Sequence, residues 1–432
     1  MILQRLRLQG FRNLEDTVLT IPPEGVALVG PNAQGKSNFL EAIHYLEIFR
    51  SARGTRDTRL IRFGEAFFRL EGGLLAPSPV SDGPEGLRTV AAAVQRSGPV
   101  KKVSVDGEVP ARIGDALGQV GSVLFTPDDV RLVSDGPQER RRFLDIVLSV
   151  NVPGYLEALQ RYRQVLAQRN AALRDRAPRG SVEAWDSLLV RSGARVLRMR
   201  AAWVRLGAPT FRDVVREVSG GECGTLDYLP GIPGGRHPET GYAAGPGSEG
   251  EAEGEAEREP EGEPEGKPEK NPGFMDSPES GADARWEVLL AEALREGREE
   301  ERRRGMTLVG PHRDELRLRL DPEPGDAAPR GGRDLREYGS GGQKRTAALA
   351  LRILEAETVL RRRGRPALLL LDDVFAELDA ARSERVLGLL DRTAAGQVIL
   401  TAPKEADVRF RHDRLPRWRI LGGRIHAGGD HE

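Results

Sequence analysis

Residues 30–37 constrain the fold of this chain more than any other segment, because they read GPNAQGKS and fit the pattern G-x-x-x-x-G-K-[ST]. A short apolar run, Val26–Val29, precedes them, and a helical pattern from Ser37 to Phe49 follows. The glycines permit a tight loop whose backbone N–H groups point at phosphate oxygens, at the positive end of the helix. The ammonium group of Lys36 would neutralise phosphate charge, and the hydroxyl of Ser37 would bind Mg²⁺. The pattern therefore predicts a site for ATP and Mg²⁺ formed by Gly30, Pro31, Asn32, Ala33, Gln34, Gly35, Lys36 and Ser37.

A second apolar run ends in two carboxylates. Residues 367–371 read ALLLL, which is typical of a strand buried on both faces of a parallel sheet, and Asp372 and Asp373 follow directly. Ligands bind at the carboxyl ends of such strands. We expect Asp372 to hold Mg²⁺ through water and Asp373 to orient or deprotonate the attacking water. The predicted catalytic residues are Asp373, Asp372 and Lys36.

A glycine-rich segment precedes a third helical pattern, Thr346–Leu360. Ser340 is a plausible N-cap, and Gly341 and Gly342 leave backbone N–H groups open to an anion. With Gln343 these residues resemble the LSGGQ signature of ABC ATPases, with Tyr-Gly in place of Leu. The resemblance implies that Ser340, Gly341, Gly342 and Gln343 of one subunit contact the nucleotide in the phosphate loop of another. Residues 377–379 similarly resemble the D-loop of that superfamily.

The formal net charge of −1 hides two opposed parts of the chain. Residues 249–270 contain ten Glu against Arg258, Lys267 and Lys270, a net charge of −7 that leaves +6 for the rest. Only seven of the 65 basic residues are lysine. Arginine-rich composition suits phosphate and nucleic acid, although a genomic base bias explains it equally well. The acidic segment is expected to be disordered, either as a simple loop insertion or as a functional segment that mimics DNA or shields a basic groove.

Other features exclude whole classes of protein. No run approaches the ~18–20 apolar residues of a transmembrane helix, and the N-terminal MILQRLRLQGFRNL lacks the apolar stretch of a signal peptide. Cys223 is the single cysteine, and no Cys/His cluster has zinc-ligand spacing. We therefore expect a cytoplasmic protein with no membrane partner, rather than a secreted, membrane or zinc-finger protein.

The patterns predict an α/β fold in which one ATPase lobe is interrupted by helices. Helical periodicity dominates residues 136–220, and the run is too short for an extended coiled coil. The predicted domains are an N-terminal ATPase part (1–115), a helical arm (116–230), an acidic Gly/Pro/Glu insertion (231–284), a continuation of the arm (285–304), and a C-terminal ATPase part with signature and Asp372 (305–432).

Motifs along nearly the whole chain, except the acidic insertion, resemble the RecF family of bacterial recombination-mediator ATPases. They are residues 11–13, 30–37, 124–129, 139–145, 168–173, 310–314, 340–343 and 371–379. The resemblance implies an SMC-like P-loop ABC-ATPase head with a helical second domain. It also implies ATP-dependent homodimerisation, binding to single-stranded DNA and gapped duplex, and help for RecR and RecO in loading RecA, which supports the SOS response.

Several positions depart from the superfamily pattern. Asp373 stands where glutamate is usual, which suggests slow hydrolysis and a switch-like role. Together with the resemblance, this predicts a weak, DNA-dependent ATPase that acts as a switch. Thr401 follows the next strand in place of a switch histidine, and residues 124–129 offer no Q-loop glutamine. His312 is either a phosphate contact or a structural histidine. A final set of arginines is either DNA-facing or simply solvated: Arg140, Arg141, Arg142, Arg161, Arg163 and Arg169.

Two other classes compete with this interpretation. A transporter ATPase subunit would place the signature far closer to Lys36 and would carry a switch histidine. An SMC-like or nuclease-associated head would need long coiled-coil arms or a nuclease site, and the sequence displays neither.

Overall fold

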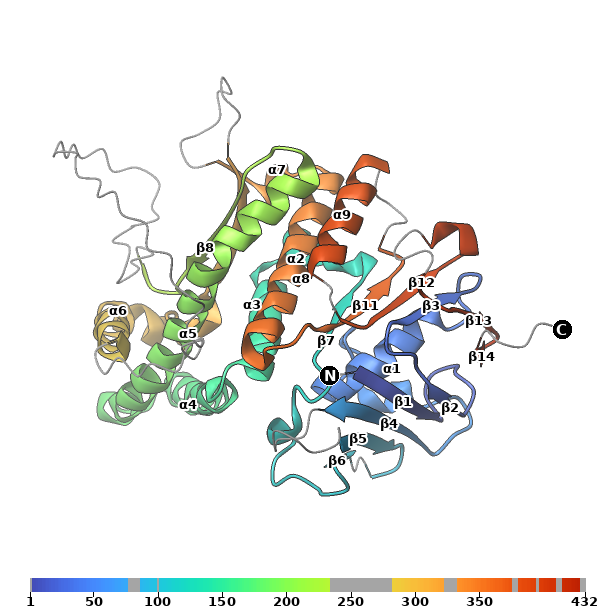
Figure 1. Cartoon of the computed structure of the whole chain (residues 1–432). Coiled ribbons are helices and arrows are strands. Elements are labelled where there is room, and N and C mark those ends of the chain that lie inside the picture. The colour runs from blue at the N-terminus through green and yellow to red at the C-terminus, as the bar shows by residue number, and fades with distance from the viewer. Residues whose placement is uncertain are drawn as a thin grey trace. The chain divides into compact units, whose positions relative to one another are not determined.

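The computed structural model describes residues 2–76, 86–98, 101–233, 282–321, 332–374, 380–393, 396–408 and 414–427. The chain divides into two compact units (Figure 1). Unit 1 comprises Met1–Leu156, Arg205–Asp227 and Arg317–Glu432, and unit 2 comprises Glu157–Val204 and Tyr228–Leu316. The predicted domain borders stay predictions, and residues 234–281 of the acidic insertion lie outside the described residues.

A six-stranded sheet forms the centre of unit 1, in the order β14-β13-β3-β12-β11-β7. Its strands are β3 (Gly25–Val29), β7 (Ser122–Phe125), β11 (Leu368–Asp372), β12 (Val398–Ala402), β13 (Arg417–Leu421) and β14 (Arg424–His426). All neighbours are parallel except β13 and β14. Every residue of β3, β11 and β12 is buried, which explains their continuous apolar sequences.

A five-stranded antiparallel sheet, in the order β2-β1-β4-β5-β6, forms the second layer of unit 1. It consists of β1 (Ile2–Gln9), β2 (Thr17–Thr20), β4 (Phe67–Ala76), β5 (Gly86–Gln95) and β6 (Lys101–Val105). Leu3, Leu6 and Leu8 of β1 are buried, with a register shift between Leu3 and Arg5, so this sheet has one core face and one face toward solvent.

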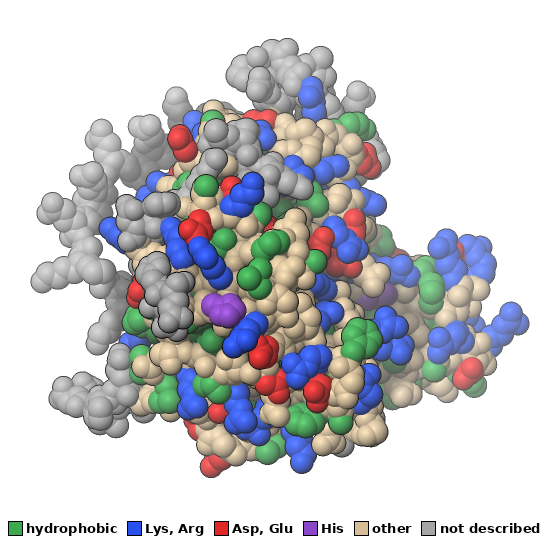
Figure 2. Space-filling model, turned by 90° about the vertical axis from the view of Figure 1, so that its right-hand side faces the viewer, with side chains coloured by type: hydrophobic (Ala, Val, Ile, Leu, Met, Phe, Trp, Pro, Cys, Tyr) green, Lys and Arg blue, Asp and Glu red, His purple; other side chains and the backbone are tan. Residues whose placement is uncertain are grey.

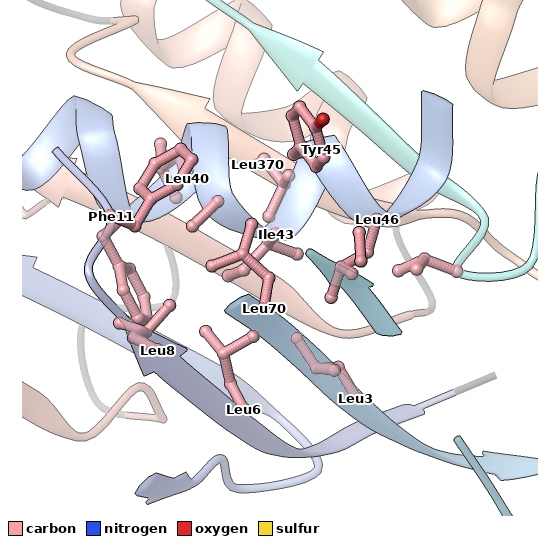
Figure 3. Packing of buried hydrophobic residues seen from close by; sticks show 14 of the residues in the cluster. Leu3, Leu6, Leu8, Phe11, Leu40, Ile43, Tyr45, Leu46, Leu70 and Leu370 are labelled. Carbon is pink, nitrogen blue, oxygen red and sulfur yellow. The ribbon is translucent and has the colours of Figure 1, made fainter. Parts of the chain in front are cut away.

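Helix α1 (Lys36–Ile48) lies between the two sheets. Figure 3 shows Leu40, Ile43 and Leu46 of α1 in one cluster with side chains of both sheets, among them Leu6 of β1 and Leu370 of β11. A helix covered on both sides must be apolar around most of its circumference, as the sequence of α1 is. This packing holds the N-terminus of α1 against the end of β3.

The other helices of unit 1 follow in the chain. They include α2 (Arg131–Ser134), α3 (Pro137–Asn151), α7 (Leu335–Tyr338), α8 (Gly341–Arg363) and α9 (Ala380–Thr393). Helix α8 contacts β7, α2 and α3. A small sheet of β8 (Gly224–Leu229), β9 (Glu315–Leu320) and β10 (Arg333–Asp334) completes the set of strands in the described residues.

Unit 2 is built from α4 (Tyr155–Arg174), the N-terminal part of α5 (Arg179–Ser219) and α6 (Ala282–Arg304). The fully buried guanidinium group of Arg169 joins α4 to α5 and α6, since it donates to Asp186 at 2.8 Å and to Glu301 at 2.7 Å. Buried arginine is tolerated here because its charge is matched by carboxylates. No helix in the described ranges is long and apolar enough to cross a membrane.

Candidate nucleotide-binding site

The loop of residues 30–37 connects β3 to α1, as the sequence predicts. Gly35 has φ +112°, in the left-handed region that favours glycine. Gly30 is required for a different reason, because a Cβ at this position would lie 2.4 Å from the backbone oxygen of Ile420. Glycine at these two positions lets the loop turn sharply and lie against β13.

Lys36 lies beneath the loop and is only 4% exposed. Its Nζ donates to the backbone oxygen of Gly30 at 2.7 Å, to that of Pro31 at 3.3 Å and to Oδ1 of Asn32 at 3.3 Å. The ammonium group thus lies inside the ring of loop atoms, which is where a bound phosphate would need positive charge.

Ser37 and Asp372 meet at the carboxyl edge of the parallel sheet. The Ser37 hydroxyl donates to Oδ1 of Asp372 at 2.9 Å. The Ser37 oxygen would be free to bind Mg²⁺ directly while its proton stays hydrogen-bonded to Asp372, which would then hold the ion through one of the waters that Mg²⁺ retains. The described residues contain no group of three or more His, Cys, Asp or Glu suited to a metal. Mg²⁺ in nucleotide sites needs only one or two protein ligands besides phosphate and water, so this finding is compatible with the proposed site.

Thr401, at the end of β12, connects the two aspartates. Its Oγ1 donates to Oδ1 of Asp372 at 2.9 Å and accepts the backbone N–H of Asp373 at 3.1 Å. Asp373 has φ +45°, an uncommon conformation for a residue other than glycine, and this hydrogen bond helps to hold it. The residue in the switch-histidine position therefore positions both carboxylates.

Burial raises the pKa of the Asp373 carboxyl group, while the positive charge of Lys36 acts in the opposite direction and the charge of Asp372 raises it further. A carboxylate with a raised pKa is a stronger proton acceptor than an ordinary aspartate. The environment of Asp373 is thus suited to a general base.

Asn13 supports the phosphate loop, although the sequence pattern alone did not assign it a role. Its Nδ2 donates to the backbone oxygen of Gln34 at 3.3 Å, and its Oδ1 accepts from Asn38 at 2.8 Å. The Gln34 side chain in turn accepts the backbone N–H of Gly422 at 2.6 Å. These contacts join segments far apart in sequence, which local patterns do not reveal. The one signal in the sequence was the family motif at residues 11–13, which includes Asn13.

The signature segment begins α8 with a capping box. The Ser340 hydroxyl accepts the backbone N–H of Gln343 at 3.2 Å, and the Gln343 side chain accepts the backbone N–H of Ser340 at 2.8 Å. Ser340 and Gly341 are exposed, and nothing lies within 4 Å of a Cβ built on Gly341. Among the described residues, no observed hydrogen bond or ion pair joins the signature to the loop of residues 30–37, and α7 and α1 lie apart in Figure 1.

Some candidates from the sequence have structural roles instead. Both ring nitrogens of His312 are occupied, by the Tyr162 hydroxyl at 2.6 Å and the Thr307 backbone oxygen at 3.0 Å. Arg169 is buried in its ion pairs, and Arg140 is buried and donates to the Asp135 backbone oxygen at 2.8 Å, so neither can face DNA. Residues 377–379, the predicted D-loop, lie outside the described residues.

Comparison with known proteins gives close full-length relatives, although no family model matches. The chain is 36% identical to "DNA replication and repair protein RecF" of Anaeromyxobacter dehalogenans strain 2CP-C, over 94% of this chain and 93% of the relative. It is 35% identical to the protein of that name from Chloroflexus aggregans, over 99% and 100% of the two chains.

Solved structures agree with these relatives. A structure described as the recombination mediator protein RecF-ATP in the RecFOR pathway matches with a TM-score of 0.75 and 25% identity, over 99% of this chain and 98% of the other. An Smc head bound to the C-terminal winged-helix domain of ScpA matches with a TM-score of 0.51 and 15% identity, over 98% and 96% of the chains, which shows a likeness of fold alone.

The fold and the site together define an ATPase head of the ABC type, which confirms the predicted α/β fold class. Within that class, the full-length similarity is specific: the chain belongs to the RecF family of DNA replication and repair proteins.

Proposed function

We propose that this protein is an ATP-dependent DNA-binding protein of recombinational repair and replication, in which ATP closes a homodimer on DNA and slow hydrolysis reopens it. One observation carries the proposal. Lys36, Ser37, Asp372 and Asp373 lie at one edge of the sheet, while the signature of the same unit is exposed. The phosphate loop and the signature are thus two separate halves of a nucleotide site. A second copy of the chain would bring its signature to the phosphate loop of the first and complete the site.

The ATP half of the site consists of residues 30–37 together with Asp372 and Asp373. Backbone N–H groups of the loop and the Lys36 ammonium group bind the phosphates, and Ser37 and Asp372 hold Mg²⁺. Mg²⁺ supplies charge stabilisation at the transferring phosphate. Asp373, held by Thr401, orients the attacking water and accepts its proton.

Slow turnover follows from the side chain at position 373. Aspartate is one methylene shorter than the glutamate usual at this place, so its carboxylate reaches less far from the backbone. In such a weak ATPase, ATP binding stabilises the closed dimer. The slow rate of ATP hydrolysis then determines how long the dimer stays on DNA. DNA and ATP then each tighten the binding of the other, because both favour the same dimer.

The signature half of the site is Ser340, Gly341, Gly342 and Gln343. The exposed N-terminus of α8 presents backbone N–H groups and the positive end of a 23-residue helix, both suited to the γ-phosphate held by the other subunit. Gln343 donates to Glu222 at 2.6 Å, which holds this turn against the segment that follows α5.

The proposed partners are DNA with single-stranded gaps, RecR and RecO, with RecA loading as the result and the SOS response as its context. The names of the relatives and the RecFOR description of the solved structures support this role. A cytoplasmic location belongs to the same proposal. Figure 2 shows Lys and Arg side chains spread among Asp and Glu on the face in view, so charge alone does not single out a DNA surface on that face.

The competing classes lack comparable support. A transporter subunit would not give full-length similarity to RecF proteins. The likeness to Smc heads concerns the fold, and the helices α4, α5 and α6 are far shorter than coiled-coil arms.

The proposal is tested by sedimentation and DNA binding, with and without ATP and Mg²⁺, of the wild type and three variants. We expect ATP to convert the wild type to DNA-bound dimers. Asp373→Asn should trap that state, Lys36→Arg should weaken it, and Ser340→Arg should abolish it, since arginine at the exposed cap would block the facing nucleotide. Ser340→Thr, which keeps a capping hydroxyl, is the matched control.

A wild type that stays monomeric and ignores DNA with every nucleotide would refute the ATP-sandwich argument. Dimers that form equally well in Ser340→Arg would show that association uses another surface.

A further inference from the structure

The side chain of Phe63 is fully exposed, with a relative accessibility of 101%. Burying a phenylalanine side chain is worth about 1.5–3 kcal/mol, and here none of that stabilisation is used. Its neighbours Leu60 and Ile61 are buried at 0% and 4%, so the chain passes from the core to a single projecting aromatic ring.

The turn that carries Phe63 is tightly held. The Glu65 backbone N–H donates to the Arg62 backbone oxygen at 3.1 Å, and Gly64 has φ +87°, as a type II turn requires at its third position. The Arg62 backbone N–H donates to Gly10 at 2.8 Å, and the Arg96 backbone N–H donates to Ala66 at 2.8 Å. The backbone at Phe63 is therefore held in place, and only the rotamers of the ring have to be ordered when a ligand stacks on it.

Two arginines and two carboxylates lie around this turn. The guanidinium group of Arg96 donates to the backbone oxygens of Glu65 and Arg62, at 3.2 and 3.3 Å. The carboxylate of Glu65 is matched by Arg62, which also pairs with Asp16 at 2.8 Å. The nearby acidic groups are therefore already neutralised.

The segment leading to the turn adds three exposed arginines, Arg53, Arg56 and Arg59. In the described part of the chain, no ion pair is observed for any of them. Arg56 and Arg59 are neighbours in a tight turn, since the Arg59 backbone N–H donates to the Arg56 oxygen at 2.9 Å. The carboxylate in this stretch, Asp57, is occupied by Lys101 at 2.7 Å.

We propose that Phe63 is a stacking platform for an unpaired or terminal DNA base, and that Arg53, Arg56 and Arg59 bind the phosphates next to that base. An exposed aromatic ring and exposed arginines in one segment, residues 53–63, are the groups that single-stranded DNA needs, because every base has a face to stack and every nucleotide a phosphate. A hydrophobic protein partner would favour several apolar groups rather than one ring in a segment with three exposed arginines. This inference rests on the proposed DNA-binding function and assigns it a site.

The same turn is connected to the nucleotide loop through the segment that follows β1. Arg62 donates to the Leu14 backbone oxygen at 2.8 Å, and Asn13, the preceding residue, supports Gln34 of the phosphate loop. A DNA base stacked on Phe63 would thus contact a turn that is hydrogen-bonded to the segment of Asn13 and Leu14, which also supports the phosphate loop.

The test compares the full-length wild type with Phe63→Ala, Phe63→Trp and the double variant Arg56→Ala/Arg59→Ala, in ATP and Mg²⁺. The DNA is a gapped duplex with 2-aminopurine at the unpaired position beside the junction, and a continuous duplex serves for comparison. Controls are Val109→Ala and Arg212→Ala, which change an exposed apolar and an exposed basic side chain elsewhere in unit 1.

Base stacking is worth about 1–3 kcal/mol, so Phe63→Ala should bind gapped DNA about 5- to 100-fold more weakly and lose the quenching of 2-aminopurine. Phe63→Trp should keep the wild-type affinity for gapped DNA and the quenching of 2-aminopurine. The arginine variant should weaken binding to both DNAs and lower the salt slope by about one for each phosphate that is no longer neutralised. Because Phe63 packs on nothing, its variants should unfold at the wild-type temperature.

Wild-type affinity and quenching in Phe63→Ala would overturn this inference while leaving the proposed function intact. A wild type that binds no DNA with ATP would instead refute the proposed function itself. Loss of RecR or RecO binding in Phe63→Ala, with DNA binding unchanged, would make the ring a protein contact and would also overturn the inference.

Discussion

The hydroxyl of Ser37 donates a hydrogen bond of 2.9 Å to Asp372, a residue 335 positions away in the sequence. The contact exists because β3 and β11 both end at one edge of the six-stranded sheet, separated only by β12. Thr401 at the end of β12 lies between them and bonds to Asp372 as well. Strands β11 and β12 and the first turn of α1 thus each contribute one side chain at the point where the nucleotide is proposed to bind.

Thr401→Val should slow ATP hydrolysis and leave ATP binding nearly unchanged. The change removes one donor to Asp372 and the acceptor for the Asp373 backbone N–H, while keeping the side-chain shape. Hydrogen bonds to charged groups are worth about 1.5–3 kcal/mol, so a fall of roughly 10- to 100-fold is expected in single-turnover hydrolysis.

Thr401→Ser, which keeps the hydroxyl, is the matched control and should remain close to the wild type. Equal hydrolysis by the valine and serine variants would contradict the positioning role of Thr401.

The rate of ATP hydrolysis should depend on the ionisation of Asp373. Burial raises the pKa of this carboxyl group, and a protonated carboxyl group cannot accept a proton from water. The rate should therefore fall on acidification at a higher pH than an ordinary aspartate would produce. Turnover is measured at saturating ATP from pH 5 to 8, with nucleotide affinity measured separately.

Asp373→Asn is the comparison for this profile, since its residual rate has no carboxylate to titrate. Identical pH profiles for the two proteins would show that another group limits hydrolysis.

Local patterns sufficed to predict the parts of the site that are formed by neighbours in sequence. The loop of residues 30–37 between a strand and a helix, the buried strand before Asp372 and the N-cap at Ser340 all depend on short-range rules. The meeting of the loop with Asp372 at one sheet edge follows from the parallel arrangement, which the alternation of strands and helices indicates.

Contacts across long sequence distances could not be derived in this way. Arg169 reads as a solvated helical residue, yet it is buried because Glu301, 132 positions later, neutralises it. Asn13 has no local feature that reveals its bond to Gln34. Burial of a charge is decided by its partner, and the partner is known only once the chain has folded.

A buried ion pair in unit 2 gives a further prediction. Asp314 accepts from Arg200 at 2.6 Å, from the Gly231 backbone N–H at 2.7 Å and from the Tyr228 hydroxyl. Asp314→Asn leaves the Arg200 charge buried without its carboxylate, and we expect the free energy of unfolding to fall by about 3–5 kcal/mol. Urea denaturation measures it.

The double variant Asp314→Asn/Arg200→Met removes both charges and should be more stable than Asp314→Asn alone. If the losses in the free energy of unfolding from Asp314→Asn and Arg200→Met simply add in the double variant, the two residues are not coupled. The ion pair would then not be what stabilises this part of unit 2.

His44 of α1 should make the protein less stable in acid. Its ring is buried beside Ser122, at 3.1 Å, and burial together with the charges of Arg352 and Arg50 lowers its pKa to about 3. An unfolded histidine titrates near pH 6.5, so below that pH the unfolded chain binds a proton that the folded chain refuses. Between pH 6.5 and 3 this linkage costs about 1.4 kcal/mol for each pH unit.

The buried carboxyl groups of Glu47 and Glu355 act in the opposite sense, because burial raises their pKa and the folded state takes up protons first. A comparison of the wild type with His44→Asn separates the histidine from these groups, since asparagine can still bond to Ser122 but carries no charge.

His44→Asn should be the less stable protein at pH 7.5. Its deficit in the free energy of unfolding should shrink by about 1.4 kcal/mol per unit between pH 6 and 5. His426→Asn is the matched change of an exposed histidine and should keep the wild-type slope. Parallel curves for His44→Asn and the wild type would show that the folded protein accommodates a charged His44.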